Sequence, residues 1–171
     1  MKKIIILTLI ISGAFQASAQ DAIEKFFSKY EDDDNFTQVV ITQRMFGLFS
    51  DLDLEDEEDR ELAEAIGGLK SLKILTKDQT SEGKSLFKEA NKLVDKGQYE
   101  VLMTITGSDE NLTFYIKERN KLIEELLLIM GGDDEFFIMD LVGEIDLKQV
   151  SRLANAMDID GLENLEKLDD N

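Results

Sequence analysis

The sequence predicts an α+β fold: a single domain with an antiparallel or mixed sheet of about six strands and helices mainly on one face. Helical and strand periodicities alternate in the first half of the chain, whereas four strand patterns follow one another in the second half. A run of strands after alternating elements is typical of helices that segregate to one face of a sheet. No internal repeat or low-complexity linker interrupts the pattern, so one domain is expected.

Residues 1–19 have the composition of a secretory leader. Lys2 and Lys3 precede the apolar run from Ile4 to Phe15, and a triplet of small residues ends at Ala19. These are the charged, apolar and cleavage regions of a leader, so we expect cleavage after Ala19 and export to the periplasm or the medium. The apolar run is short for a membrane span, so no stable membrane anchor is expected after cleavage.

The remaining chain divides into an α+β domain over residues 20–157 and an acidic C-terminal segment over residues 158–171. The whole chain has 37 acidic and 19 basic side chains and a formal net charge of −18. Such a charge repels nucleic acid and anionic lipid headgroups and favours cationic partners.

Apolar spacing and β-branched residues define the elements in the first half of the domain. Apolar residues at the helical spacing i, i+3, i+4 and i+7 predict a helix over residues 23–30. Residues 36–42 are rich in β-branched side chains and predict the first strand. A second helix is expected from Asp56 to the Gly67-Gly68 pair, and residues 69–75 predict the second strand. The segment between the first strand and the second helix contains the apolar cluster Met45, Phe46, Leu48, Phe49 and Leu52.

A third helix has the clearest pattern. Its apolar face consists of Leu86, Phe87, Ala90, Leu93 and Val94. Gly97 predicts a left-handed end to this helix. The opposite side carries Lys84, Lys88, Lys92 and Lys96. We take these four lysines as candidate residues for binding an acidic partner, and an ordinary solvated face is the alternative interpretation.

Four strands follow the third helix. Alternating apolar residues predict strands over residues 99–105 and 112–117, with a hairpin loop between them. Residues 121–130 contain good helix formers, but the neighbouring strand patterns and the turn at residues 131–134 favour a strand paired with residues 136–142. A capping box, Asp146 with Gln149, then predicts a last helix, whose sheet-facing residues are Leu147, Val150, Leu153, Ala154 and Met157.

Missing residue types exclude several chemistries. The chain has no histidine, cysteine, tryptophan or proline. It therefore has no disulfide, thiol nucleophile, imidazole metal ligand or Ser-His-Asp triad. No nucleophile lies beside a recognisable base and no phosphate-binding glycine loop occurs, so we expect a non-enzymatic protein without catalytic residues, cofactor or metal.

Three other candidate sites, for calcium, for hydrolysis and for an apolar ligand, each have a structural interpretation as well. The acidic stretch from Asp51 to Asp59 offers oxygen ligands for calcium, but an EF-hand loop needs glycine where Asp56 lies, so a solvated helix entrance is favoured. Carboxylate pairs suit a hydrolase, although 37 acidic residues would place some pair together in nearly any fold. Aromatic side chains suit an apolar-ligand pocket, although helical spacing favours core packing. The aromatic group is Phe26, Phe27, Tyr30, Phe46 and Phe49.

Four segments in this order resemble domain-of-unknown-function family 4252. They are residues 36–46, which end in Gln-Arg-Met-Phe, and residues 68–75, 99–103 and 143–147. The resemblance spans nearly the whole mature chain. It implies a small exported protein like those of Bacteroidota, often a lipoprotein and often encoded near extracytoplasmic-function sigma factors, with no established catalytic activity. Gln20 stands where a lipoprotein would need its cysteine, so lipid tethering is not expected.

We therefore expect an exported, non-enzymatic protein of the cell envelope that acts through contacts with a protein partner. The resemblance adds an expected link to extracytoplasmic-function sigma-factor regulation. The alternatives are an apolar small-ligand carrier, which would copurify with its ligand, and a carboxylate-dependent hydrolase, which would present two inward-facing carboxylates in a cleft. The acidic balance argues against a nucleic-acid partner.

Overall fold

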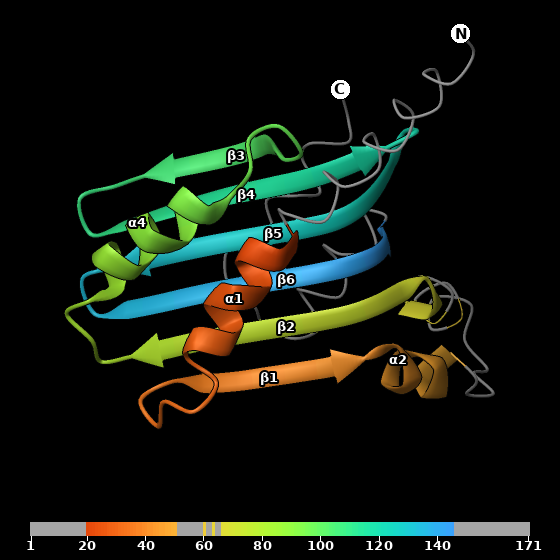
Figure 1. Cartoon of the computed structure of the whole chain (residues 1–171), viewed down its shortest axis with the longest axis horizontal. Helices are drawn as coiled ribbons and strands as arrows, with labels where there is room; N and C mark the ends of the chain where they lie inside the picture. Colours follow the sequence, from red (N-terminus) through yellow and green to blue (C-terminus); the bar gives the residue numbers. More distant parts are fainter. Residues whose placement is uncertain (1–19, 51–59, 61–62, 64–65, 146–171) are drawn as a thin grey trace, which may run out of the picture.

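The computed structural model describes residues 20–50, 60, 63 and 66–145. These residues form an α+β domain with a six-stranded sheet, in which every neighbouring pair of strands is antiparallel (Figure 1). The elements in chain order are α1 (Gln20–Lys29), β1 (Thr37–Thr42), α2 (Gln43–Ser50), β2 (Leu69–Asp78), α4 (Gly83–Leu93), β3 (Glu100–Thr106), β4 (Glu110–Arg119), β5 (Leu122–Gly132) and β6 (Glu135–Ile145). The predicted fold class is confirmed.

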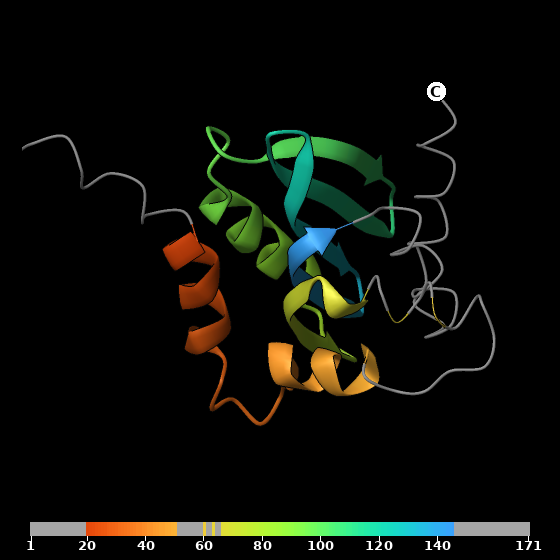
Figure 2. The ribbon, with the colours of Figure 1, turned by 90° about the vertical axis from the view of Figure 1, so that its right-hand side faces the viewer.

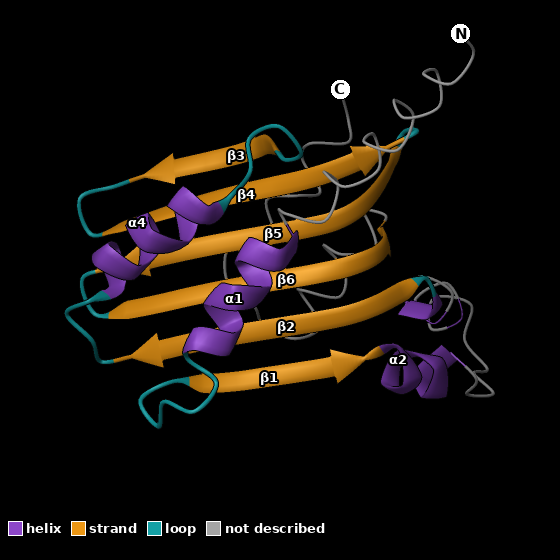
Figure 3. Ribbon diagram, in the orientation of Figure 1, coloured by secondary structure: helices purple, strands orange, loops and turns teal. Residues whose placement is uncertain are grey.

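The order of strands across the sheet is β1-β2-β6-β5-β4-β3. The last four strands form a meander, and β6 returns to pair with β2, so β5 and β6 lie at the centre while β1 and β3 form the two edges (Figure 3). Residues 121–130 adopt the predicted strand, because their apolar side chains fill both faces of this central position.

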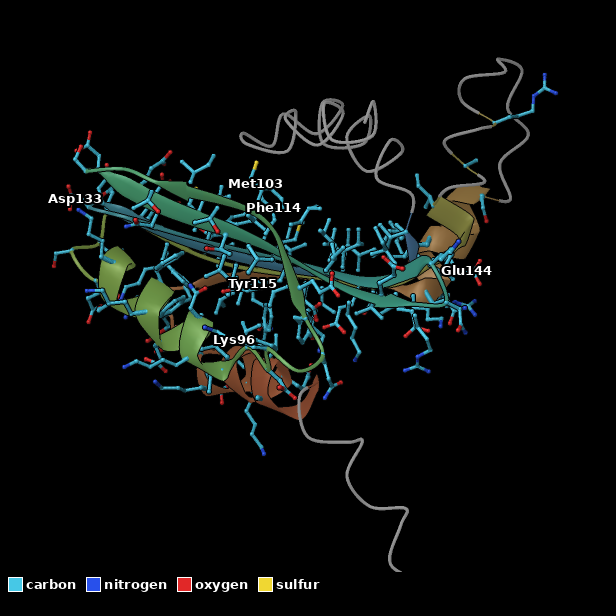
Figure 4. The ribbon with its side chains drawn as sticks, turned by 90° about the horizontal axis from the view of Figure 1, so that it is seen from above. Lys96, Met103, Phe114, Tyr115, Asp133 and Glu144 are labelled. Carbon is cyan, nitrogen blue, oxygen red and sulfur yellow. The ribbon has the colours of Figure 1, made fainter. Side chains whose placement is uncertain are left out.

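Helices α1 and α4 lie on the same face of the sheet (Figures 1 and 2). Apolar residues of both helices pack there against alternate residues of the strands. The opposite face carries a second apolar cluster, to which α2 contributes Phe46. Neighbouring residues of β4 show this alternation, since Tyr115 points to the side of α4 and Phe114 to the other side (Figure 4).

Helix α4 buries the predicted apolar face but ends earlier than predicted. Leu86, Ala90 and Val94 are buried, which confirms the orientation of the helix. The prediction that Gly97 ends it in a left-handed conformation is wrong, because α4 ends at Leu93 and Val94 is already extended. The side chain and carbonyl of Asp95 then form the turn, since the carboxylate accepts a 2.9 Å hydrogen bond from the Gly97 N–H.

Other sequence expectations differ from the structure or lie outside its described part. Residues 43–50 form α2, for which the sequence predicted only an apolar cluster. Phe46 is buried, whereas Met45 and Leu48 are exposed. The leader, the acidic stretch from Asp51 to Asp59, the last helix and the acidic C-terminal segment lie outside the described residues. Among the described helices, none combines the length and hydropathy that a membrane crossing needs.

Glycines allow α4 to approach the sheet closely. A Cβ atom on Gly83, the first residue of α4, would lie 2.0 Å from the Glu135 carbonyl oxygen. A Cβ atom on Gly131 of β5 would lie 2.4 Å from the Gly83 carbonyl oxygen. Both distances are far below van der Waals contact, so any larger residue would push the helix from the sheet.

We predict that Gly83→Ala lowers the free energy of unfolding by about 2–3 kcal/mol, because the added methyl group overpacks the junction between α4 and the β5–β6 turn. Gly47→Ala in α2 is the matched control. Its Cβ atom would meet nothing within 4 Å, so a gain of about 0.5–1 kcal/mol is expected from helix propensity. Urea denaturation of both variants measures the difference, and equal stabilities would contradict the close approach.

Candidate functional site

A polar cluster interrupts the apolar packing on the helix-covered face of the sheet. It is here called the carboxyl cluster and consists of Glu24, Lys73, Tyr99, Lys117, Glu125 and Asp140. Its centre is two acidic residues, Glu125 of β5 and Asp140 of β6, which are only 2% and 7% exposed. Buried carboxyl groups are rare without partners, so this pair is the most unusual chemical feature of the described residues.

Strand register brings the two carboxyl groups together. Asp140 pairs with Leu127 of β5, so Glu125 lies diagonally across from it, two residues along the same strand face. Lys73 of β2 pairs with Asp140 on the other side, and Lys117 of β4 pairs with Glu125. Two lysines therefore flank two carboxyl groups across four adjacent strands.

Glu125 has two partners. The Tyr99 hydroxyl donates a hydrogen bond to Oε1 of Glu125. The Lys117 ammonium nitrogen lies 3.6 Å from Oε2 and 5.8 Å from the centre of the Tyr99 ring. Burial and the Glu125 carboxylate both raise the pKa of Tyr99, so this residue stays a protonated donor.

Asp140 lacks such support. Its Oδ1 is buried and has no hydrogen-bond partner among the described residues. Burial and then the nearby Glu125 charge raise the pKa of Asp140 to about 8, and the Lys73 charge opposes this shift only in part. Lys73 itself forms an ion pair with Glu24 of α1. Asp140 therefore keeps its proton at neutral pH.

The two carboxyl groups resemble a catalytic acid and base pair in composition, but they are not accessible to a substrate. A protonated Asp140 lies beside a second carboxyl group, as in enzymes that use paired carboxylates. Both side chains are covered by the domain, however, so a substrate cannot reach either of them without opening the packing. The geometry supports a proton held inside the fold.

This cluster was not among the sites predicted from the sequence. A signal was present, because Glu125 and Asp140 are acidic residues inside two strongly apolar strands. The apolar pattern could not show that they share a face, because both strands are apolar on both faces and a register shift lies between Ile123 and Glu125. Ile123 packs on the face opposite α1 and α4, whereas Glu125 lies on the helix-covered face.

The four candidate lysines divide into two groups. Lys84 is bound within the domain, where its ammonium group lies 2.5 Å from Asp133 Oδ1 and 2.8 Å from the Ser108 carbonyl oxygen. Lys88 and Lys92 are exposed on α4, and Lys96 is exposed just beyond its end. Figure 4 shows Asp133 and Lys96 at opposite ends of this helix.

The aromatic group does not line one pocket. Phe26 and Phe27 pack beneath α1 on the helix-covered face, whereas Phe46 packs on the opposite face. Tyr30 lies at the margin of the first cluster, where its hydroxyl donates to Glu89. In the part of the chain that the structure describes, no group of three or more acidic residues is placed to hold a metal ion.

A comparison with family models gives one match. The model described as a domain of unknown function, DUF4252, matches residues 30–153. The chain belongs to the DUF4252 family. The resemblance seen in the sequence is thus confirmed, although the match begins at Tyr30 and leaves out α1 of this DUF4252 protein. Neither the curated proteins nor the solved structures give a match.

We predict that Asp140→Asn changes how stability depends on pH. The raised pKa means that the folded protein keeps a proton that the unfolded chain releases above pH about 4. The contribution of Asp140 to the free energy of unfolding therefore falls as pH rises from about 4 to about 8 and then levels off. An amide cannot ionise, so the variant should gain about 1–3 kcal/mol relative to wild type at pH 8 and nothing at pH 4.

Thermal unfolding from pH 4 to pH 9 measures this difference. Asp32→Asn is the control, because Asp32 is an exposed aspartate in the loop after α1 and its loss should leave the pH profile unchanged. Parallel pH profiles for wild type and Asp140→Asn would show that Asp140 is ionised in the folded protein.

Proposed function

We propose that this DUF4252 protein is an exported, non-enzymatic protein of the cell envelope that binds a protein partner through the outer side of α4. The observation that carries the proposal is the cationic surface of Lys88, Lys92 and Lys96, here called the lysine face. None of these three lysines forms a salt bridge with another described residue. These three exposed lysines, on α4 and just after it, contrast with a chain of net charge −18.

The packing of α4 supports a fixed binding surface. Leu86 and Ala90 anchor the helix to the sheet, and Lys84 ties its first turn to Asp133. Lys88 and Lys92 are one turn apart and exposed, so they project from a rigid support. Charges on a rigid support steer an oppositely charged partner and act mainly on the rate and selectivity of association.

The carboxyl cluster supports a non-enzymatic role. Its two central carboxyl groups, Glu125 and Asp140, are buried rather than open to a ligand. Its effect on the protein is through stability, as for other buried ionisable groups.

Export is supported by the position of the leader. Residues 1–19 match a leader in composition, and the small residues Ala17 and Ala19 precede the expected cleavage site. Cleavage there removes Lys2 and Lys3 but leaves the buried residues Ile23, Phe26 and Phe27 in place.

We predict that the exported protein begins at Gln20. Intact-mass analysis of protein recovered from the envelope fraction measures the N-terminus. Ala19→Lys should block cleavage and leave the leader attached, because the cleavage site requires a small side chain. A wild-type protein that retains its leader would contradict the proposed location.

We also predict that reversing two charges of the lysine face slows partner capture. The variant Lys88→Glu/Lys92→Glu should keep the wild-type fold, because both side chains are exposed, and should capture the partner from envelope extract far more slowly. The wild-type rate should fall steeply with added salt.

Lys70→Glu/Lys121→Glu is the matched control, since it makes the same change in net charge at two exposed lysines outside α4. Capture should persist in this control. Equal loss in both variants would show that net charge, rather than the lysine face, determines binding.

A further inference from the structure

One edge of the sheet is exposed and uncharged. Residues 35–43, which include the whole of β1, contain no charged side chain in a chain that is 33% charged. No described strand pairs with the outer side of β1, which is the lowest strand in Figure 1. Val40 is 52% exposed, and Val39 is also exposed.

Edge strands are normally protected against pairing with another chain by charges, prolines or bulges. The opposite edge, β3, has such features, since it begins with Glu100 and its register shifts between Val101 and Met103. Strand β1 has neither, because all six of its residues pair with β2 in one continuous register. The outer side of β1 can therefore accept a further strand.

The charges at the two ends of β1 select the direction of that strand. Four acidic residues, Glu31 to Asp34, come before β1, and Arg44 comes directly after it. Arg44 is exposed, and so is Asp34. A second β1 aligned in parallel would place acidic end against acidic end, whereas an antiparallel β1 places each Arg44 beside the acidic end of the other copy.

We propose that two copies of this chain associate through β1, antiparallel and centred on Val40, so that their sheets join into one. A two-fold axis perpendicular to the sheet keeps each side chain on its own face. An even-numbered residue can therefore lie opposite only an even-numbered residue of the other copy, and an odd-numbered residue only opposite an odd-numbered one. Centring on Val40 places Val40 opposite its own copy on the helix-covered face and Val39 opposite Ile41 on the other face. Both pairs are β-branched and therefore suit cross-strand packing.

This contact goes beyond the proposed binding of a partner, because it uses a different surface. The lysine face lies on α4, which covers the sheet, whereas β1 lies at its edge (Figure 2). Loss of one association therefore leaves the other intact, and the two experiments fail separately.

Oligomeric state and site-specific crosslinking test the proposal. The mature protein should change from monomer to dimer in sedimentation equilibrium between about 1 µM and about 500 µM. Because the chain has no cysteine, Val40→Cys introduces one thiol that meets only its own copy across the two-fold axis. Mild oxidation should convert this variant to a covalent dimer.

Val101→Cys is the matched control, because Val101 is 57% exposed on the opposite edge strand. It should remain largely monomeric under the same oxidation. Monomer at every concentration, or equal crosslinking of the two variants, would overturn the proposal, and the second result would indicate random collision.

Arg44→Glu tests the charge argument without a change on β1 itself. It should weaken the dimer by about tenfold at low salt, since two contacts per dimer change from attraction to repulsion. Lys88→Glu makes the same change in charge on α4 and should leave the dimer constant within about twofold. Equal dimer constants for wild type and Arg44→Glu would overturn the antiparallel arrangement.

Discussion

The pairing of β5 with β6 is the interaction on which the rest of the structure depends. Both strands are buried on both faces, so their alternating side chains supply each of the two apolar clusters. Leu126 and Leu128 face one side, while Leu127 and Ile129 face the other. A change in this register by one residue would move the side chains of one strand to the opposite face and separate Glu125 from Asp140.

The same burial explains the chemistry of the centre. Asp140 keeps its proton because two carboxyl groups are removed from water and donors are supplied to Glu125 only. Binding surfaces are left to the periphery, where α4 presents the lysine face and β1 presents an open edge. The proposed contacts with other proteins therefore involve exposed surfaces and leave the buried centre of the sheet unchanged.

Most elements could be predicted from the sequence, because apolar periodicity reports local burial directly. Residues 121–130 show how context decided an ambiguous segment, since its neighbours were strands and the segment became β5. Three features depended on information that periodicity lacks. The first is α2, in which Phe46 alone is buried among the described side chains that were expected to cluster. The other two are the end of α4, which is set by Asp95, and the register shift before Glu125. The carboxyl cluster was not predicted, because the register shift before Glu125 cannot be derived from apolar periodicity. The sequence could not show which of the four candidate lysines are held within the domain, because the ion pair between Lys84 and Asp133 is a long-range contact.

Native-state hydrogen exchange tests most directly the claim that the β5–β6 pair is the stable centre of the domain. In dilute protein, the amides of β5 and β6 should exchange only through global unfolding, whereas those of β1 should exchange through smaller openings. The free energy of opening should therefore fall from the centre of the sheet to its edges. Exchange of β5 or β6 amides as fast as those of β1 would contradict this account.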